Sequence, residues 1–334
     1  MKVKIVLKQL LNQLKTDLTG KDTLSGYTFT YSWMANQLGH FCMGFVLVFF
    51  LVWGVDTFAQ QAPSWYYLAT YLVASLVWVL MELRKTIIAI NVQRSYGSFE
   101  PDTSFIWKDV IVDIAFFIYG TTIAYLGYMY NIWGIVAFVG LLIIYIFPAY
   151  HWLMRKMYYQ QACFPKYMRL SEITKTFDST VKTQIEDFSK NKGAIKVILI
   201  FGGMQAGKTA LANAIAIEHA VKCNVTRYST FLKFADLLMC RETYNRQKSN
   251  QIWPWHFSDI LVVDDINSSS NHFELIKPQD VNDVLYTGAL KDENMNFLKN
   301  MKSIWVCGGG NALQWKQLFG EIGFSESEIL AICL

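Results

Sequence analysis

Charged residues are scarce in this chain. Asp, Glu, Lys and Arg together make up 17% of its 334 residues, whereas hydrophobic residues make up 53%. A typical soluble domain has about 25% charged residues, so the composition argues against a chain built only of ordinary soluble domains. The net charge of +4 is small, and this balance gives no indication of nucleic-acid binding.

Cysteines are few and isolated. They form no Cys-x-x-Cys pair and no cluster with histidine, which argues against a zinc site or a disulfide framework. Reduced thiols in a protein that faces the cytosol are the simpler interpretation. The first residues also lack a short apolar core followed by a small-residue cleavage site, so we expect no removable signal peptide. The cysteines are Cys42, Cys163, Cys223, Cys240, Cys307 and Cys333.

Long apolar runs are concentrated in the first half of the chain. Each of four runs approaches the ~20 residues with which a helix crosses a bilayer. Backbone polar groups inside a bilayer must be satisfied within the segment, so the runs predict helices. The alternative is a set of buried helices in a large soluble core. The four runs are Leu38–Phe58, Ser64–Met81, Val110–Met129 and Ile132–Trp152.

The positions of lysine and arginine predict an orientation in the membrane. These residues are present before the first run, after the second and after the fourth, and they are absent near 60–63 and 130–131. Because cytosolic loops carry the excess of positive charge, we expect an integral multi-pass protein of a bacterial inner membrane, with both termini in the cytosol. The predicted divisions are a basic amphipathic segment (1–36), a four-helix transmembrane domain (37–153), a helical connector (154–191) and a nucleotide domain (192–334).

The basic segment has two interpretations. Between residues 3 and 18, leucine and valine recur on one helical face, with lysines at intervening positions. Such a helix fits the surface of an anionic membrane. A helix packed on the protein's own cytosolic domain would show the same pattern.

Residues 202–209 match the phosphate-binding loop G-x-x-x-x-G-K-[ST], known as Walker A. A strand-like run, Val197–Phe201, precedes the loop and a helical run, Ala210–Ala220, follows it, which is the context that this motif requires. Backbone N–H groups of the loop would surround the phosphates. Lys208 would reach the β- and γ-phosphates, and the Thr209 hydroxyl would bind Mg²⁺. The predicted nucleotide-binding residues are Gly202, Gly203, Met204, Gln205, Ala206, Gly207, Lys208, Thr209 and Ala210.

Two acids follow a second strand-like run. Residues 260–263 are apolar, and Asp264 and Asp265 come directly after them. Parallel sheets place ligands at the carboxyl ends of their strands. We expect Asp264 to hold Mg²⁺ through water and Asp265 to orient or activate the attacking water. The alternative is an acid pair that caps a helix after a core strand.

A third candidate is Asn311. It follows a predicted strand, Met301–Cys307, and three glycines. From such a position Asn311 could contact the γ-phosphate or the attacking water. The other interpretation is a glycine turn in which Asn311 caps the last helix.

Together with the stretch Val-Thr-Arg-Tyr-Ser-Thr-Phe-Leu at 225–232, these motifs resemble the AAA+ ATPases. The resemblance covers residues 192–312 and is strongest to the bacterial replication-initiator and helicase-loader branch, whose second acidic motif is also Asp-Asp. It implies an α/β P-loop domain with a parallel sheet. It also implies catalytic roles for Lys208 and Asp265, a metal-binding role for Asp264 with Thr209, and a sensor role for Asn311.

Two features depart from that family. No arginine follows Arg246, so the usual source of an arginine finger is missing; Arg227, Arg241, Arg246, Lys277 or Lys291 would have to replace it. Few residues follow Asn311 in this sequence, so we expect the helical lid to be absent or reduced. A regulatory GTPase fits less well, because no Asn-Lys-x-Asp follows the acids. An ABC transporter fits less well, because no Ser-Gly-Gly signature separates the two motifs.

These observations lead to a first hypothesis of a polytopic membrane ATPase. ATP and Mg²⁺ would act in the cytosolic domain and change the conformation or assembly of the membrane domain. Its partners would be the lipid bilayer, further copies in a homo-oligomer, and an unidentified protein partner or cargo, with no nucleic acid. The alternative is a slowly hydrolysing, nucleotide-gated membrane switch, for example in antiviral defence or permeabilisation. A third, weaker hypothesis, an anchor for DNA or a replication protein, rests on the family branch alone.

Overall fold

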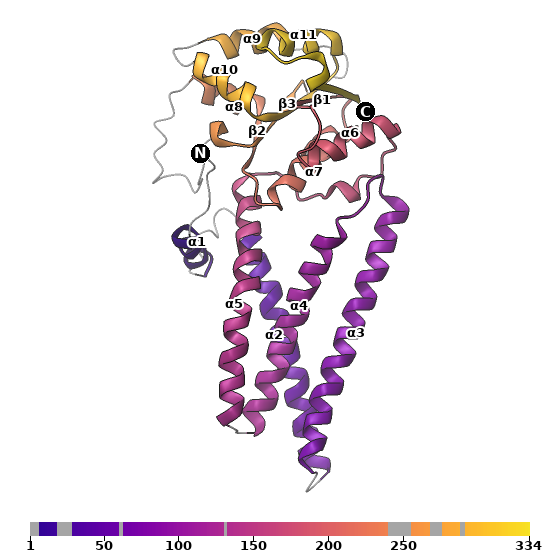
Figure 1. Cartoon of the computed structure of the whole chain (residues 1–334), viewed down its shortest axis with the longest axis vertical. Coiled ribbons are helices and arrows are strands. Elements are labelled where there is room, and N and C mark those ends of the chain that lie inside the picture. Colours follow the sequence, from indigo (N-terminus) through magenta and orange to yellow (C-terminus); the bar gives the residue numbers. More distant parts are fainter. Residues whose placement is uncertain are drawn as a thin grey trace. The chain divides into compact units, whose positions relative to one another are not determined.

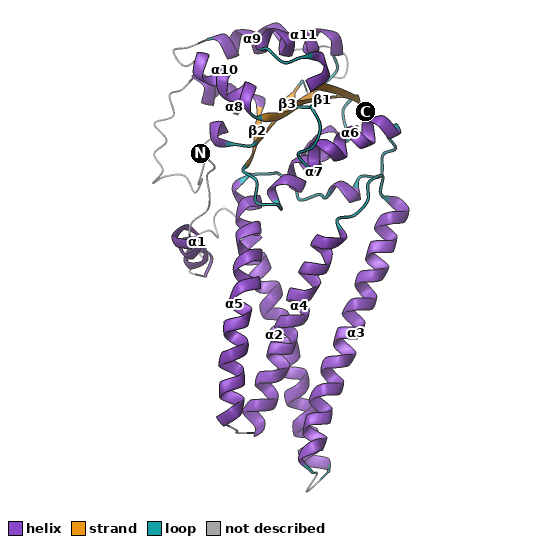
Figure 2. Ribbon diagram, in the orientation of Figure 1, coloured by secondary structure: helices purple, strands orange, loops and turns teal. Residues whose placement is uncertain are grey.

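The computed structural model describes residues 7–18, 29–59, 63–129, 132–239, 255–267, 276–287 and 291–334. It is mostly helical, with one five-stranded parallel sheet (Figures 1 and 2). The chain forms two compact units. The helical unit contains Lys8–Tyr96 and Glu100–Lys156. The sheet unit contains Gly97–Phe99 and Met157–Leu334.

The helices of the first half extend beyond the apolar runs. Arg84, Lys85 and Arg94, which the sequence pattern assigns to a loop, lie inside a helix instead. No proline or glycine interrupts residues 82–96, and a helix needs no apolar side chains to satisfy its own backbone. The helices are α1 (Leu7–Leu18), α2 (Phe29–Phe58), α3 (Ser64–Tyr96), α4 (Thr103–Met129) and α5 (Ile132–Gln161).

Two helices in the described part of the chain are long and apolar enough to cross a membrane. They are Ser32–Phe58, which is most of α2, and Thr103–Met129, which is α4. This finding rests on length and composition alone. Four spans therefore remain an expectation.

Helices α2 and α4 approach each other closely at two glycines. A methyl group added to Gly120 would overlap the carbonyl oxygen of Phe41, and one added to Gly44 would overlap that of Phe117. Small residues of this kind let two helix backbones come together. A side-chain contact adds to the packing, because Gln37 Nε2 of α2 donates to Asp113 Oδ1 of α4 at 2.7 Å.

Gly120→Ala is expected to destabilise the helical unit. The added methyl group meets backbone atoms of Phe41 and Phe45, which cannot turn away as a side chain does, and overpacking typically costs about 1–3 kcal/mol. Gly127→Ala in the same helix is the matched control, because nothing lies within 4 Å of that position. The control should be neutral or stabilising, since alanine favours helix by about 1 kcal/mol over glycine. The check is thermal unfolding of both variants; equal Tm values would contradict the close approach.

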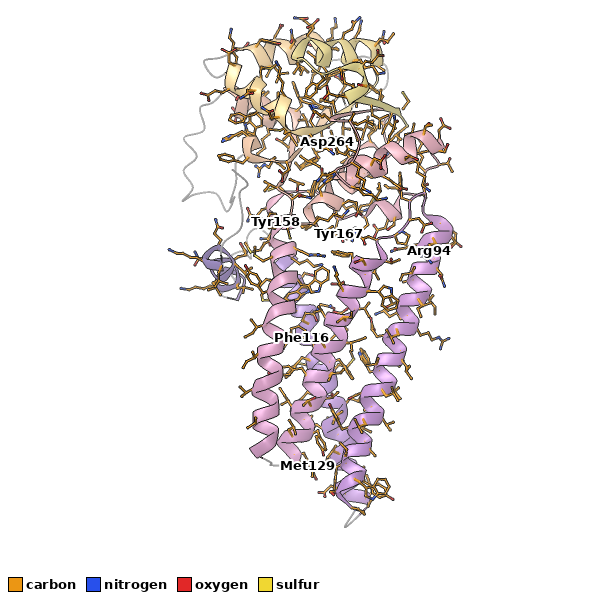
Figure 3. All side chains as sticks on the ribbon, viewed as in Figure 1. Arg94, Phe116, Met129, Tyr158, Tyr167 and Asp264 are labelled. Carbon is orange, nitrogen blue, oxygen red and sulfur yellow. The ribbon has the colours of Figure 1, made fainter. Side chains whose placement is uncertain are left out.

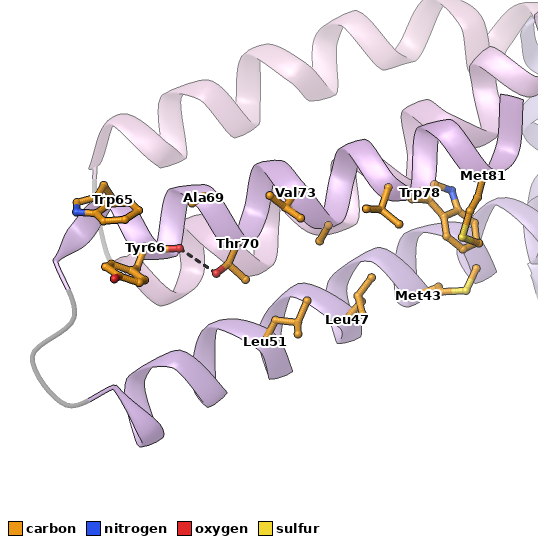
Figure 4. Close-up of a pocket in the computed structure, with 12 residues that line it drawn as sticks. Met43, Leu47, Leu51, Trp65, Tyr66, Ala69, Thr70, Val73, Trp78 and Met81 are labelled. Carbon is orange, nitrogen blue, oxygen red and sulfur yellow. Dashed lines mark hydrogen bonds between the residues drawn. The ribbon is translucent and has the colours of Figure 1, made fainter.

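The helical unit also exposes large apolar side chains. Phe50 is 59% exposed on α2, Leu72 is 53% exposed on α3, and Ile111 is 61% exposed on α4. An open groove of about 790 Å³ runs between α2 and α3 (Figure 4). Its lining is almost entirely apolar and includes Leu47, Leu51, Trp65, Val73, Trp78 and Met81.

The sheet unit is built on five parallel strands in the order β2-β3-β4-β1-β5. Strand β4 lies between β1 and β3, with Ile198 and Val262 both level with Ile304. The strands are β1 (Val197–Phe201), β2 (Thr226–Thr230), β3 (Ile260–Ile266), β4 (Lys302–Cys307) and β5 (Ile329–Cys333). The helices are α6 (Ser179–Ser189), α7 (Lys208–Ala220), α8 (Phe231–Met239), α9 (Pro278–Tyr286), α10 (Lys291–Asn300) and α11 (Ala312–Ile322).

Helices cover both faces of this sheet (Figure 1). Residues of α8, α9, α10 and α11 join one core with alternate strand residues such as Leu199, Val263 and Trp305. Helix α7 packs on the opposite face, where the intervening residues Ile198 and Val262 are fully buried. Burial on both faces explains why β1 and β3 are continuous apolar runs.

Several predicted elements differ from the observed ones. The first strand is correct, and the helix after the phosphate loop begins two residues earlier, at Lys208. A turn at 221–223 follows α7, and β2 begins at Thr226, within the stretch 225–232 that carries the family resemblance. The connector expected to be helical over 154–191 is helical only in part, because α5 ends at Gln161 and α6 begins at Ser179. Strand β5 is not anticipated at all, and it pairs with β1 along its whole length.

Candidate nucleotide site

The phosphate-loop motif lies between β1 and the first turn of α7. Gln205 has φ 64° and Gly207 has φ 89°, so the chain passes twice through the left-handed region, which is costly for a residue other than glycine or asparagine. These turns direct the loop back over the N-terminus of α7, where unpaired N–H groups favour an anion. Gly203, Met204, Gln205 and Gly207 are exposed, and Gly202, Ala206 and Ala210 are half-buried.

Lys208 is folded across the loop. Its side chain is 7% exposed, and its Nζ donates to the carbonyl oxygens of Gly202 at 2.8 Å and Gly203 at 2.7 Å. Burial lowers the pKa of this ammonium group, and the nearby Asp264 carboxylate opposes the shift. The charge is thus held inside the loop, where it would meet a bound phosphate group.

Thr209 and Asp264 meet at the carboxyl end of the sheet. The Thr209 hydroxyl donates to Asp264 Oδ1 at 3.2 Å, although 55 residues separate them in the sequence. Asp264 is 2% exposed, and Figure 3 marks it within the sheet unit. A hydroxyl and a carboxylate together supply hard oxygen ligands, which suit Mg²⁺ directly or through its water shell.

Asp265 adopts a different conformation from its neighbour. It is exposed, its φ is 68°, and the pairing of β3 with β4 shifts register between Val263 and Ile266. Its backbone N–H donates to Asp264 Oδ1 at 2.7 Å. The bulge therefore buries one carboxylate at the sheet and leaves the next directed to solvent, where it could reach a water molecule.

The segment after β4 lies beside both motifs. Gly308 O accepts from Gly202 N at 3.3 Å, and a methyl group at Gly308 would overlap the carbonyl oxygen of Asn267. Asn311 is exposed and is the N-cap of α11, where its side chain accepts from Leu313 N at 2.9 Å. Asn311 therefore caps the helix, which is the second of the two roles that the sequence allows. Its contact with a γ-phosphate remains a prediction.

One candidate for an arginine finger is buried. Arg227 is 3% exposed on β2, and its Nη1 donates to Cys163 Sγ at 3.5 Å. It therefore does not present its charge to a neighbouring molecule. Arg241 and Arg246 lie outside the described residues. Lys277 and Lys291 are exposed, at the starts of α9 and α10.

Two side-chain contacts in the sheet unit involve residues that belong to no sequence motif. The hydroxyl of Tyr228 on β2 donates to Asp264 Oδ2 at 2.8 Å. Arg169, in the segment before α6, makes a bidentate ion pair with Glu218 of α7, at 2.8 and 2.9 Å. The partners of each contact are 36 and 49 residues apart, so no local sequence pattern predicts that they meet.

Comparison with known proteins identifies no relative. No model of a protein family matches the chain, and no curated protein sequence matches it. The geometry of the site therefore carries the functional argument.

Proposed function

We propose that the chain is a membrane ATPase in which the sheet unit binds and hydrolyses ATP with Mg²⁺. The contact of the Thr209 hydroxyl with Asp264 Oδ1, beside Lys208, carries this proposal. Phosphoryl transfer needs a cation on the phosphates, a hydroxyl and a carboxylate for the metal, and a group that orients water. Lys208, Thr209, Asp264 and Asp265 would fill these roles, in the manner of the AAA+ ATPases.

The apolar surface of the helical unit supports a location in a lipid bilayer. In water, large exposed side chains such as Phe50, Leu72 and Ile111 would form an aggregation-prone patch, whereas hydrocarbon solvates them. We propose four spans formed by α2 to α5, with both termini and the sheet unit on the cytosolic side of a bacterial inner membrane. ATP binding or hydrolysis would then change the conformation, or the assembly into a homo-oligomer, of the membrane helices, and so act on a protein partner or cargo.

Asp265→Asn tests the catalytic role. The exposed carboxylate is expected to orient the attacking water, and loss of a general base typically reduces turnover by about 10²–10⁴-fold. Binding of ATP should stay unchanged, because Asp265 makes its backbone contact through N–H. The measurement is ATP hydrolysis and ATP affinity of the full chain in nanodiscs. Asp236→Asn, at an exposed position of α8 outside the two motifs, is the control. Unchanged hydrolysis in Asp265→Asn would exclude this residue as the base.

Burial of Arg227 favours a second candidate function, a nucleotide-gated membrane switch with little turnover. A site without an arginine finger binds the triphosphate but hydrolyses it slowly. Under this alternative, ATP would drive assembly or membrane permeability equally well in the wild-type protein and in Asp265→Asn. Leakage of a dye from liposomes, with ATP and with ADP, separates the two functions.

A further inference from the structure

We propose that Tyr228 is a positioning residue for Asp264, holding this carboxylate in the orientation that binds the nucleotide's Mg²⁺. This inference rests on the proposed function of the site and adds a residue that no motif includes. The evidence for it is the set of hydrogen-bond donors to the two carboxylate oxygens of Asp264.

Each oxygen of Asp264 has its own donors. Oδ1 accepts from the Thr209 hydroxyl at 3.2 Å and from the Asp265 N–H at 2.7 Å. Oδ2 accepts from the Tyr228 hydroxyl at 2.8 Å. The Asp265 N–H and the Tyr228 hydroxyl are not expected to bind the metal. The Thr209 hydroxyl is, and we expect it to turn from Asp264 towards the metal. With Mg²⁺ bound, Tyr228 would be the side chain among these three donors that still holds the carboxylate.

The sheet register explains how Tyr228 reaches Asp264. Strands β2 and β3 are parallel, with Tyr228 level with Val262 and Thr230 level with Asp264. Because side chains two residues apart share a face of a strand, Tyr228 lies on the face of β2 that corresponds to Asp264 on β3. A long phenol side chain spans the diagonal offset, which a shorter donor such as serine would not.

Tyr228 is itself fixed and remains a donor. Its backbone N–H donates to Ala162 O at 2.8 Å, and its ring centroid lies 6.4 Å from that of Phe164. These contacts hold the phenol where its O–H donates to Asp264 Oδ2.

The contact has a measurable consequence for metal affinity. Groups that orient a metal-binding carboxylate from outside the ligand sphere typically contribute 10–100-fold to metal affinity or activity. Removing the Tyr228 hydroxyl leaves Oδ2 without this donor, so that the contacts at Oδ1 alone orient the Asp264 carboxylate. Mg²⁺ should then bind more weakly, while ATP without metal should bind as before, because the phosphate loop is untouched.

The test compares Tyr228→Phe with the wild-type full chain in nanodiscs. ATP binding is measured in EDTA and across a Mg²⁺ titration. We expect unchanged binding in EDTA and a rise of about 10–100-fold in the Mg²⁺ concentration that half-saturates the metal-dependent increase in affinity. Tyr159→Phe is the matched control, because it removes a phenol oxygen from the same unit and the donors to Asp264 do not include Tyr159.

Specificity is tested in a second background. In Asp264→Asn, the further change Tyr228→Phe should have no additional effect on Mg²⁺ dependence, since residues that act through one contact are not additive. A wild-type Mg²⁺ profile in Tyr228→Phe would overturn the proposal, as would an equal loss of binding in EDTA, which would show a merely structural role. A wild-type chain that binds no ATP in either condition would overturn the proposed function itself.

Discussion

Lys208→Ala is expected to abolish ATP hydrolysis and to weaken ATP binding by about 10²–10⁴-fold. The Lys208 ammonium makes two hydrogen bonds to the loop carbonyls, to Gly202 O and Gly203 O, and phosphate oxygens would take their place. Each hydrogen bond to a charged group contributes about 1.5–3 kcal/mol. Losing two such bonds weakens binding by about 3–6 kcal/mol. At 1.4 kcal/mol for each factor of ten in affinity, this is about 10²–10⁴-fold.

The fold should survive this change. The carbonyl groups that lose Lys208 belong to residues 202 and 203, in a loop open to solvent, so water can satisfy them. Lys222→Ala, an exposed position just beyond the other end of α7, is the control and should bind ATP normally. Calorimetric titration with Mg-ATP measures both variants. If Lys208→Ala binds Mg-ATP as tightly as the wild-type protein, the loop is not a phosphate site.

Arg169→Ala is expected to cause a large loss of stability in the sheet unit. Arg169 is 8% exposed, and its guanidinium pairs through Nε and Nη2 with Glu218, which is also 8% exposed. Breaking a buried pair from one side costs about 3–5 kcal/mol, because the remaining charge stays buried. For a unit of this size, this corresponds to a decrease in Tm of roughly 6–20 °C, at 2–4 °C per kcal/mol.

An exposed ion pair supplies the comparison. Lys190 and Glu186 are one helical turn apart, and Lys190 Nζ lies 3.1 Å from Glu186 Oε2. The Lys190 side chain is 53% exposed. Pairs of this kind contribute about 0.3–0.5 kcal/mol, so Lys190→Ala should hardly change Tm. Replacing both Arg169 and Glu218 with leucine should recover much of the stability that Arg169→Ala loses. Similar Tm values for Arg169→Ala and Lys190→Ala would show that the buried pair is not structurally important.

The Arg169 pair also connects the segment after α5 to the phosphate-loop helix. Leu170 N donates to Glu218 Oε1 at 3.3 Å, so backbone and side chain of this segment are both attached to α7. Glu218 is on the same helix as Lys208 and Thr209, three turns further on. Loss of Arg169 should therefore lower ATP affinity only through unfolding, and ligand binding should partly restore Tm.

The amino-acid sequence by itself determined the local parts of this protein. The strand Val197–Phe201, the glycine-containing loop after it and the helix that follows are contiguous in the chain, so the change from strand to helical periodicity predicts the strand exactly and the start of the helix to within two residues. The acid pair is local in the same way, because Asp264 and Asp265 directly follow the apolar residues 260–263 of β3. The apolar runs predicted helices, and their ends were misjudged where charged residues continue α3 to Tyr96.

Only the tertiary structure decided which distant residues meet. Gly120 and Gly127 look alike in the sequence, yet only Gly120 faces the backbone of α2. Tyr228 and Asp264 are 36 residues apart, and Arg169 and Glu218 are 49 apart; such pairs follow from strand order and helix packing, which no local pattern encodes. Strand β5 was missed because its five residues become a strand by pairing with β1, and burial against a partner outweighs intrinsic propensity in so short a segment.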